Sequence, residues 1–408
     1  DNVAFVSYKV YGGVPSDEKG FLFLGIVDPK HRVGTNYDGQ HDLHDTTSIS
    51  LGGSDNFGNN EDKYDANRFK SEYLASAYLR VATGDYDGDG VDEIAVYVPS
   101  TTNPRIEIYK VSGDWKDSTY MDRIMIFQLD GYKATKAVAG NVPTAAGDTL
   151  IPNMVSLVSA DFDMDGIDDL AISYGYTGQA MDSAPCKAVM IFGEKAGRFG
   201  SRTQDIPLSY NGTDVVRASF ATGDIDSDGK KELVVGGSLA GANFNPNERY
   251  VAIYQWNGNS FSISQSKKFN IFEKDNSGNY INSRVPDNKT EYYSLPVAPA
   301  NIAIGHFNGI SEPVNIYIDS ILIELGDNGM EIAALLDDNL KSANFDFVEW
   351  GAHAAQLNGD GTDTLITMLS DVKHDTPPKN NFTGYFNAII GRLNGTTGGK
   401  TYMSAVYG

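Results

Sequence analysis

Three copies of one acidic motif are the residues of this 408-residue chain best suited to chemistry. Each reads Asp-x-Asp-x-Asp-Gly-x-x-acid and runs directly into a short apolar segment: GDYDGDGVDEIAV (84–96), ADFDMDGIDDLAI (160–172) and GDIDSDGKKELVV (223–235). Three carboxylates at alternate positions, a glycine for a sharp turn and a further acid provide the charged oxygens that Ca²⁺ prefers. Because the motif recurs, it also predicts a repeat architecture.

The position of the last acid separates this motif from the EF-hand loop, which lies between helices. An EF-hand ends in a bidentate Glu at position twelve, where this chain has the apolar Val96, Ile172 and Val235. The acid stands at position nine instead, and the flanking segments, such as YLRVAT and EIAVYV in the first copy, are typical of strands. We therefore expect each loop to join two β-strands.

The expected ligands are four side-chain carboxylates from each loop and the backbone carbonyl at position seven. They are Asp85, Asp87, Asp89, Glu93 and the carbonyl of Val91; Asp161, Asp163, Asp165, Asp169 and the carbonyl of Ile167; Asp224, Asp226, Asp228, Glu232 and the carbonyl of Lys230. The alternative is an acid-rich Asx/Gly turn that binds no metal. Repulsion among carboxylates held close together without a counter-ion favours the metal, so about three structural Ca²⁺ ions are expected.

A calcium loop between two strands resembles the FG-GAP/VCBS repeat, which builds the β-propeller of integrin α subunits and of many secreted bacterial proteins. The resemblance rests on the three loops and, loosely, on the segments VYVPS, ISYGY and VVGGS that follow them, and it covers about residues 75–408. It implies structural calcium between the first two strands of a propeller blade. Glu93 and Glu232 depart from the Asp usual at position nine, and a longer carboxylate can still ligate while shifting the ion.

Strand-like segments divide the chain into six units, and we expect one domain over residues 1–408: an all-β propeller of four-stranded blades. The blades are expected at about 1–55, 75–135, 150–210, 215–272, 298–340 and 348–408. In the third blade, the fourth strand is expected near IPLSY (206–210). The first blade shows three strands and is expected to lack its inner strand, which the C-terminal end or residues outside this chain would supply. A seventh blade remains an alternative if 55–73 or 273–296 contains one.

The motif decays in the last two units. The segment AIGHFNGISEPVNIYI has His306 and Asn308 at the first two ligand positions and no third acid, so no calcium is expected there. The segment QLNGDGTDTLITM has Gln356 and Thr364 in place of carboxylates at positions one and nine, which predicts poor ion binding. Hydrogen bonds alone can hold both turns.

Composition narrows the class of protein. A net charge of −22 argues against a nucleic-acid partner, because phosphate backbones bind basic surfaces. A single cysteine, Cys186, excludes an internal disulfide and is expected to be a small buried or strand-edge residue. No apolar stretch reaches membrane-spanning length. Low-affinity calcium loops fill outside the cell, where calcium is abundant, so a secreted or cell-surface location is expected.

Motifs for other chemistry are weak or absent. No Gly-x-Ser-x-Gly elbow, P-loop or His-Glu-x-x-His motif occurs, and HDLHD (41–45) lacks the further ligand that zinc requires. Tyr109 and Tyr254 lie within strand patterns and are expected to pack in the core rather than to bind carbohydrate. Tyr292 and Tyr293 lie in the polar insertion 273–296 and are the better binding candidates, since rigid scaffolds carry function on loops.

The sequence therefore predicts a non-enzymatic, calcium-stabilised propeller, monomeric and extracellular, that binds a protein or carbohydrate ligand. One alternative is a calcium-dependent polysaccharide lyase, which would need a Lys, Arg or His base among the carboxylates. Another is a spacer between functional domains. The chain begins at DNVAFVSYKV and ends in TYMSAVYG, and we expect a mature form or an excised region of a longer exported protein.

Overall fold

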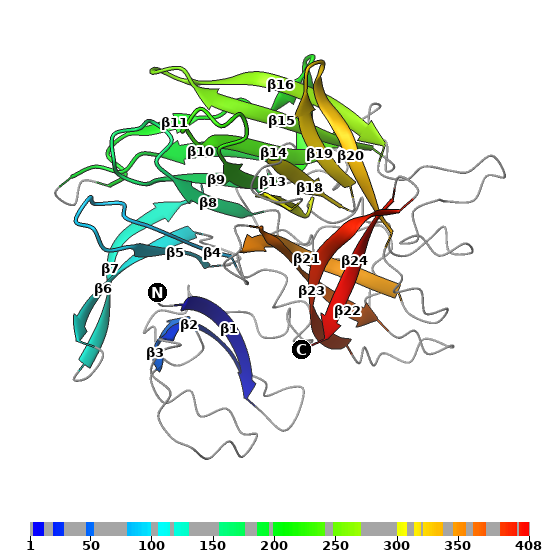
Figure 1. The fold of residues 1–408 in the computed structure, drawn as a ribbon. Helices are drawn as coiled ribbons and strands as arrows, with labels where there is room; N and C mark the ends of the chain where they lie inside the picture. The colour runs from blue at the N-terminus through cyan, green and yellow to red at the C-terminus, as the bar shows by residue number, and fades with distance from the viewer. Residues whose placement is uncertain are drawn as a thin grey trace.

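Apolar segments of the sequence pair into antiparallel sheets, and no helix occurs among the residues that the structure describes (Figure 1). This computed structural model describes residues 3–11, 19–27, 46–52, 80–98, 105–114, 118–129, 155–175, 186–195, 199–240, 248–270, 300–307, 314–319, 321–337, 346–355, 362–372, 384–397 and 400–407. Within these residues, no helix has the length and apolar character required to cross a membrane.

The strands follow one another along the chain as meanders. The N-terminal sheet contains β1 (Val3–Tyr11), β2 (Lys19–Val27) and β3 (Thr46–Gly52). The second sheet contains β4 (Val81–Gly84), β5 (Glu93–Val98), β6 (Arg105–Asp114) and β7 (Ser118–Gln128). The third contains β8 (Ser156–Ala160), β9 (Asp169–Gly175), β10 (Cys186–Ile191) and β11 (Thr203–Asp205). The fourth is the meander of β13 (Thr213–Gly223), β14 (Glu232–Leu239), β15 (Glu248–Trp256) and β16 (Phe261–Asn270), in which β13 counts as the first strand, and the two-residue β12 (Ser209–Tyr210) pairs with β13 at the edge of this sheet.

The remaining strands form an eight-stranded sheet made of two meanders. The fifth meander contains β17 (Ile302–Gly305), β18 (Asn315–Ile318), β19 (Ile321–Gly326) and β20 (Gly329–Asp337). The sixth contains β21 (Asp346–Ala355), β22 (Thr364–Val372), β23 (Gly384–Thr397) and β24 (Lys400–Tyr407). The two are joined by parallel pairing of β20 with β24, at Leu336 with Thr401 and Asp337 with Tyr402.

The first strands of successive sheets lie beside one another. Strand β1 contacts β4, β4 contacts β8, β8 contacts β13, β13 contacts β17, and β17 contacts β21. In Figure 1 the colour accordingly runs in order around the molecule, from the blue N-terminal sheet through the green fourth sheet to the red sixth meander. The loop that follows each first strand therefore begins beside the first strand of a neighbouring sheet.

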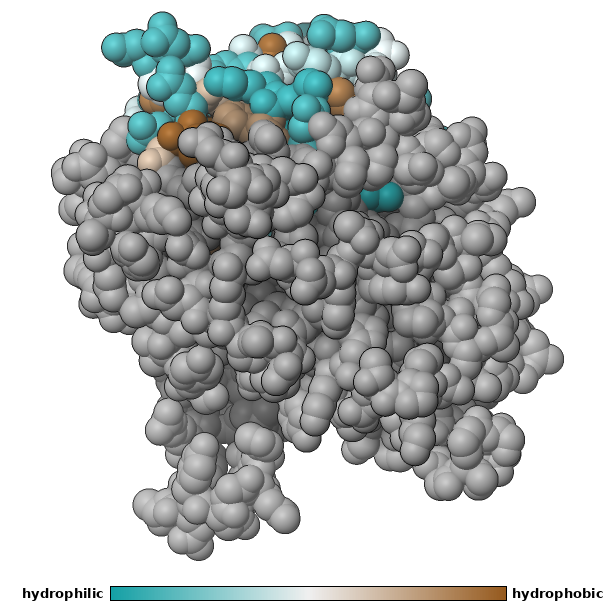
Figure 2. Space-filling model, turned by 90° about the vertical axis from the view of Figure 1, so that its right-hand side faces the viewer, coloured by the Kyte–Doolittle hydropathy of each residue, from teal (hydrophilic) through white to brown (hydrophobic). Residues whose placement is uncertain are grey.

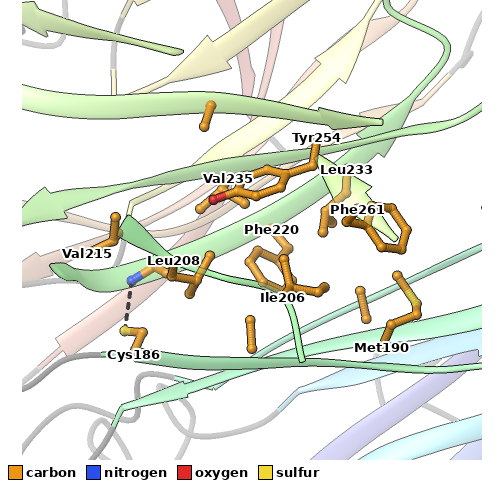
Figure 3. Close-up of a cluster of buried hydrophobic side chains, with 14 of the residues drawn as sticks. Cys186, Met190, Ile206, Leu208, Val215, Phe220, Leu233, Val235, Tyr254 and Phe261 are labelled. Carbon is orange, nitrogen blue, oxygen red and sulfur yellow. Dashed lines mark hydrogen bonds between the residues drawn. The ribbon is translucent and has the colours of Figure 1, made fainter. Parts of the chain in front are cut away.

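The sheets pack face to face through alternating side chains. On β14, Leu233 and Val235 lie in the cluster shared with the third sheet, whereas Val234 lies in the cluster shared with the fifth meander. The first of these clusters, drawn in Figure 3, includes Phe220 of β13 and Met190 of β10. Successive strand residues point to opposite faces, so a strand buried on both faces needs a continuous apolar run. That requirement accounts for segments such as ELVVGG.

A buried ion pair joins the fourth sheet to the fifth meander. The Arg249 guanidinium lies 2.5 Å from the Asp319 carboxylate, and both side chains are almost fully buried. Arg249 also donates to Ser238 Oγ, and Asp319 accepts from the Asn301 backbone. A buried charge is tolerated only when it is paired and hydrogen-bonded, as these are.

One strand lies slightly earlier in the chain than the sequence predicts. The fourth strand of the third sheet is Thr203–Asp205, directly before the predicted segment IPLSY. Within IPLSY, Ser209–Tyr210 pair with β13 of the next sheet, through a turn at Asn211 and Gly212 with positive φ. Among the described residues, the N-terminal sheet has three strands, as the sequence predicts, and its missing inner strand stays a prediction. The C-terminal β24 belongs to the sixth meander, where it pairs with β23.

On the face shown in Figure 2, the described residues are mostly hydrophilic, with a few hydrophobic residues among them. The polar side chains follow from a composition in which charged residues make up 21% of the chain.

Candidate metal centres

Each acidic loop joins the first two strands of its sheet, as the sequence predicts. The first loop (85–93) joins β4 to β5, the second (161–169) joins β8 to β9, and the third (224–232) joins β13 to β14. The residue before position one pairs with the acid at position nine: Gly84 with Glu93, Ala160 with Asp169, Gly223 with Glu232. Strand pairing therefore brings the two ends of each loop together.

Apolar side chains at position two anchor the loops. Tyr86, Phe162 and Ile225 are all buried. Tyr86 stacks on Phe199 with 4.7 Å between ring centroids, and Phe162 meets Phe261 edge to face at 5.7 Å. Burial of position two turns the side chains at positions one and three away from the core, which is where the carboxylates stand.

The backbone takes the same turn in all three loops. At position six, Gly90, Gly166 and Gly229 each have a φ of 87°. This left-handed conformation is one that glycine adopts without steric cost. At position four, φ is also positive, at 70° for Gly88 and 61° for Met164 and Ser227. The glycine of the motif is thus required by backbone conformation.

Hydrogen bonds to the first carboxylate shape the turn. In the first loop, the Asp89 amide donates to Asp85 Oδ1 at 3.0 Å and the Gly90 amide donates to Asp85 Oδ2 at 2.8 Å. Asp161 accepts the equivalent pair at 3.0 and 2.9 Å, and Asp224 accepts from Gly229 at 3.0 Å. At the other end, the position-two amide donates to the position-nine carboxylate at 2.9, 3.0 and 2.7 Å in the three loops. These are the Asx-type bonds of the turn alternative, and every loop makes them.

Besides these turn-forming hydrogen bonds, each loop contains a group of three carboxylates that lie close together. Ligand oxygens of positions one, three and nine lie within 4.8 Å of one another. The groups are Asp85, Asp87 and Glu93; Asp161, Asp163 and Asp169; Asp224, Asp226 and Glu232. Each group includes at least one buried oxygen that accepts no hydrogen bond from the described residues: Asp87 Oδ1, Glu93 Oε1, Asp163 Oδ1 and Asp224 Oδ1. A buried carboxylate oxygen without a hydrogen bond is costly, so the groups fit a cation with an all-oxygen shell.

Burial and repulsion from neighbouring carboxylates raise the pKa of the carboxylate at position nine of each loop. Burial raises the pKa of Glu93 and of Asp169 to about 7, and the neighbouring carboxylates Asp87 and Asp163 add to the rise. Burial also raises the pKa of Glu232, with Asp226 contributing. A metal ion would reverse this rise in pKa, because a bound cation is the largest local charge.

The third Asp of each motif lies outside these three-carboxylate groups. Asp89 accepts a hydrogen bond from Lys110, which lowers the pKa of Asp89, and Asp228 pairs with Lys230 at 2.9 Å. Asp165 Oδ1 accepts from the Ile167 amide. The structure therefore brings together three of the four predicted carboxylates in each loop. Ligation by Asp89, Asp165 and Asp228, and by the carbonyls of Val91, Ile167 and Lys230, stays a prediction.

Contacts between loops are a feature that sequence reasoning missed. Asp168, at position eight of the second loop, accepts a hydrogen bond from the Asp85 amide at 3.1 Å and donates its own amide to the Asp85 carbonyl at 3.0 Å. In the last two meanders, Asp363 makes the same pair of bonds with His306, at 2.7 and 3.0 Å. The sequence feature that could have indicated these contacts is the acid at position eight of each loop, Asp168 and Asp363.

The structure describes some of the other residues that the sequence singled out. Cys186 is buried, and its Sγ accepts from the Ala218 amide at 3.3 Å (Figure 3), while Tyr109 and Tyr254 are buried in the core as expected. In the fifth meander, Val314 occupies position nine and cannot ligate. Several predicted features lie outside the described residues: HDLHD at 41–45, Asn308, Gln356, the stretch 55–73, and the insertion 273–296 with Tyr292 and Tyr293.

No protein-family model matches the chain, and no curated protein shows significant similarity to it. The fold and the site define an all-β protein of successive antiparallel sheets that carries three acidic groups able to hold metal ions.

Proposed function

We propose that this protein is a non-enzymatic, calcium-stabilised β-propeller of the FG-GAP/VCBS type, in which each four-stranded meander is a blade. One observation carries the proposal: three successive sheets hold the same carboxylate group at the same place, between their first and second strands. A repeated site in a repeated setting favours a common structural role over a single catalytic one.

Calcium is the ion that the donors favour. The three groups contain only carboxylates, with no histidine or cysteine, which suits Ca²⁺ or Mg²⁺ better than Zn²⁺. Ca²⁺ accepts six to eight oxygens in flexible geometry, whereas Mg²⁺ demands a near-ideal octahedron and keeps its waters. Three carboxylates whose oxygens lie within 4.8 Å of one another, in a loop with further oxygens, suit the larger ion.

The bound ions would stiffen the inner part of the ring. Each loop follows a first strand, and the first strands lie beside one another. Neutralising the carboxylates of each group would remove the repulsion within the turn that joins its two strands. The function that follows is that of a rigid extracellular scaffold, which presents its loops to a protein or carbohydrate ligand. Its acidic surface suits a partner other than nucleic acid.

Thermal unfolding of the intact chain tests the proposal. After removal of divalent ions with a chelator, we expect the midpoint temperature (Tm) to fall, and calcium to restore it where magnesium at the same concentration does not. Ligand binding to the folded state alone adds about 2.7 kcal/mol per site at a concentration of one hundred Kd, so three sites give a large shift. An unchanged Tm in chelator would contradict the calcium role. An array of glycans and matrix proteins then tests the binding role, and turnover of an acidic polysaccharide would overturn the non-enzymatic assignment.

A further inference from the structure

The three acidic groups differ in one neighbour, which lies on the third strand of each sheet. The residue directly after position nine pairs across to the third strand: Ile94 with Tyr109, Leu170 with Ile191, Leu233 with Tyr254. The next residue along the third strand is therefore equivalent in the three sheets. It is Lys110 in the second sheet, Phe192 in the third and Gln255 in the fourth.

In the first loop, this neighbour places an ammonium group among the carboxylates. Lys110 Nζ lies 2.5 Å from Asp87 Oδ2, 2.7 Å from Asp89 Oδ2 and 3.6 Å from Glu93 Oε1. Two of these carboxylates, Asp87 and Glu93, belong to the group that would hold the ion. The Glu93 side chain is fully buried, so the ammonium compensates charge where water cannot.

The second loop has a cation at its rim. The Arg202 guanidinium lies 2.6 Å from Asp163 Oδ2 and stacks on Phe192, with 3.6 Å from its central carbon to the ring centroid. In the ion pairs of the described residues, Arg202 contacts one carboxylate of this group, that of Asp163. The other oxygen of that carboxylate, Asp163 Oδ1, accepts no hydrogen bond from these residues. Stacking holds the guanidinium against the ring, so the interior of the group stays open to an ion.

The third loop has a neutral group at the equivalent position. The Gln255 amide donates to Asp226 Oδ2 at 3.0 Å. Lys230, the nearby cation, pairs with Asp228, which lies outside the three-carboxylate group. Among the described ion pairs, none involves Asp224, Asp226 or Glu232.

We propose that Lys110 is a resident counter-ion that sets the calcium affinity of the first loop, making it at least about tenfold weaker than that of the third. The inference rests on the proposed calcium function and goes beyond it by ranking the sites. An ion entering the first loop must displace an ammonium that already neutralises two of its ligands, whereas an ion entering the third loop displaces only an amide hydrogen bond. The third loop thus depends on calcium, and the first is held by the protein itself.

Calcium titration calorimetry on the full chain, freed of divalent ions beforehand, tests the ranking. The wild type is expected to show two tight sites and one weaker site. Lys110→Gln, which installs the residue of the third loop, should convert the weak site into a third tight one. Gln255→Lys should remove a tight site. Lys110→Arg, which keeps the charge, and Lys268→Gln, which removes a surface charge on β16, should both leave the wild-type pattern unchanged.

A second readout covers the case in which Lys110→Gln is unstable without calcium. Its Tm in chelator should lie below that of the wild type, because the buried Glu93 loses its counter-ion, and the calcium-induced rise in Tm should be larger. Three equal sites in the wild type, or no change in the number of tight sites in Lys110→Gln, would overturn the role of Lys110 and leave the calcium function intact. A folded wild type that takes up no calcium would overturn both.

Discussion

Replacing Glu232 by Gln should change stability in opposite directions with and without calcium. Glu232 lies at position nine of the third loop, where its Oε2 accepts from the Ile225 amide at 2.7 Å. Glutamine has the same shape and keeps that bond through its amide oxygen. Its NH₂ group would face the other carboxylates of the group and donate to them, in place of a negative charge.

The magnitude follows from the spacing of the group. Carboxylate oxygens within 4.8 Å of one another repel by about 3.5 kcal/mol per pair at an effective dielectric constant of about 20. Asp226 is exposed and Asp224 is half-buried, so solvent screening reduces this severalfold. We therefore expect Glu232→Gln to stabilise the calcium-free protein by about 1–2 kcal/mol, which raises Tm by about 1–3 °C. In saturating calcium the variant loses a charged ligand and about 1–3 kcal/mol of binding-linked stability, so its Tm should fall below that of the wild type.

The assay is thermal unfolding of both proteins in chelator and in calcium, with Glu248→Gln as the matched control. Glu248 lies on β15 of the same sheet, outside the acidic loop, and pairs with Lys268 at the surface. The control should shift little, and equally in both conditions. If Glu232→Gln lowers Tm by the same amount with and without calcium, Glu232 is a turn-forming residue, and the reasoning from charge repulsion is wrong.

Three further predictions concern pH, the turn and the buried ion pair. The calcium-induced rise in Tm should grow as pH increases through about 7, because Glu93 and Asp169 have pKa values raised to about 7 and must lose their protons to ligate. In chelator, the stability itself should fall over the same pH range. A carboxyl group whose pKa is raised in the folded state adds stability at low pH, and this stability is lost as pH rises through about 7. Gly166→Ala should destabilise by about 1–2 kcal/mol in urea unfolding through backbone strain alone, because φ is 87° and no atom lies within 4 Å of the added Cβ. Arg249→Met should cost about 3–5 kcal/mol in the same measurement, because it leaves the Asp319 charge buried, and adding Asp319→Asn should recover part of the loss.

Much of the local structure could be predicted from the sequence, because backbone conformation and strand formation depend on residues that are close together in the chain. The position-nine acid followed by EIAV or DLAI predicts a strand after the loop, and strands begin at Glu93 and Asp169. The glycine at position six predicts the sharp turn, which the φ of 87° confirms. Continuous apolar runs predict strands that are buried on both faces, and β14 has that burial.

What could not be predicted depends on contacts between distant segments. Lys110 and Gln255 reach the loops because the third strand pairs in a particular register with the second, and nothing in the local pattern fixes that register. Arg202 precedes β11 and meets Asp163 across 39 residues of sequence.

The bond from Asp168 back to Asp85 means that the repeat seen in the sequence and the unit that unfolds need not coincide. Gly84 can approach the next sheet because it has no Cβ, which would lie 2.9 Å from that of Asp168. A deletion that removes the third sheet would take away the partner of the Asp85 amide, so neighbouring sheets are expected to open together rather than one at a time. The same bond persists between His306 and Asp363, where the first ligand position carries no carboxylate. The contact between neighbouring sheets therefore does not depend on a carboxylate at the first ligand position, so loss of metal binding and loss of this contact are separate events.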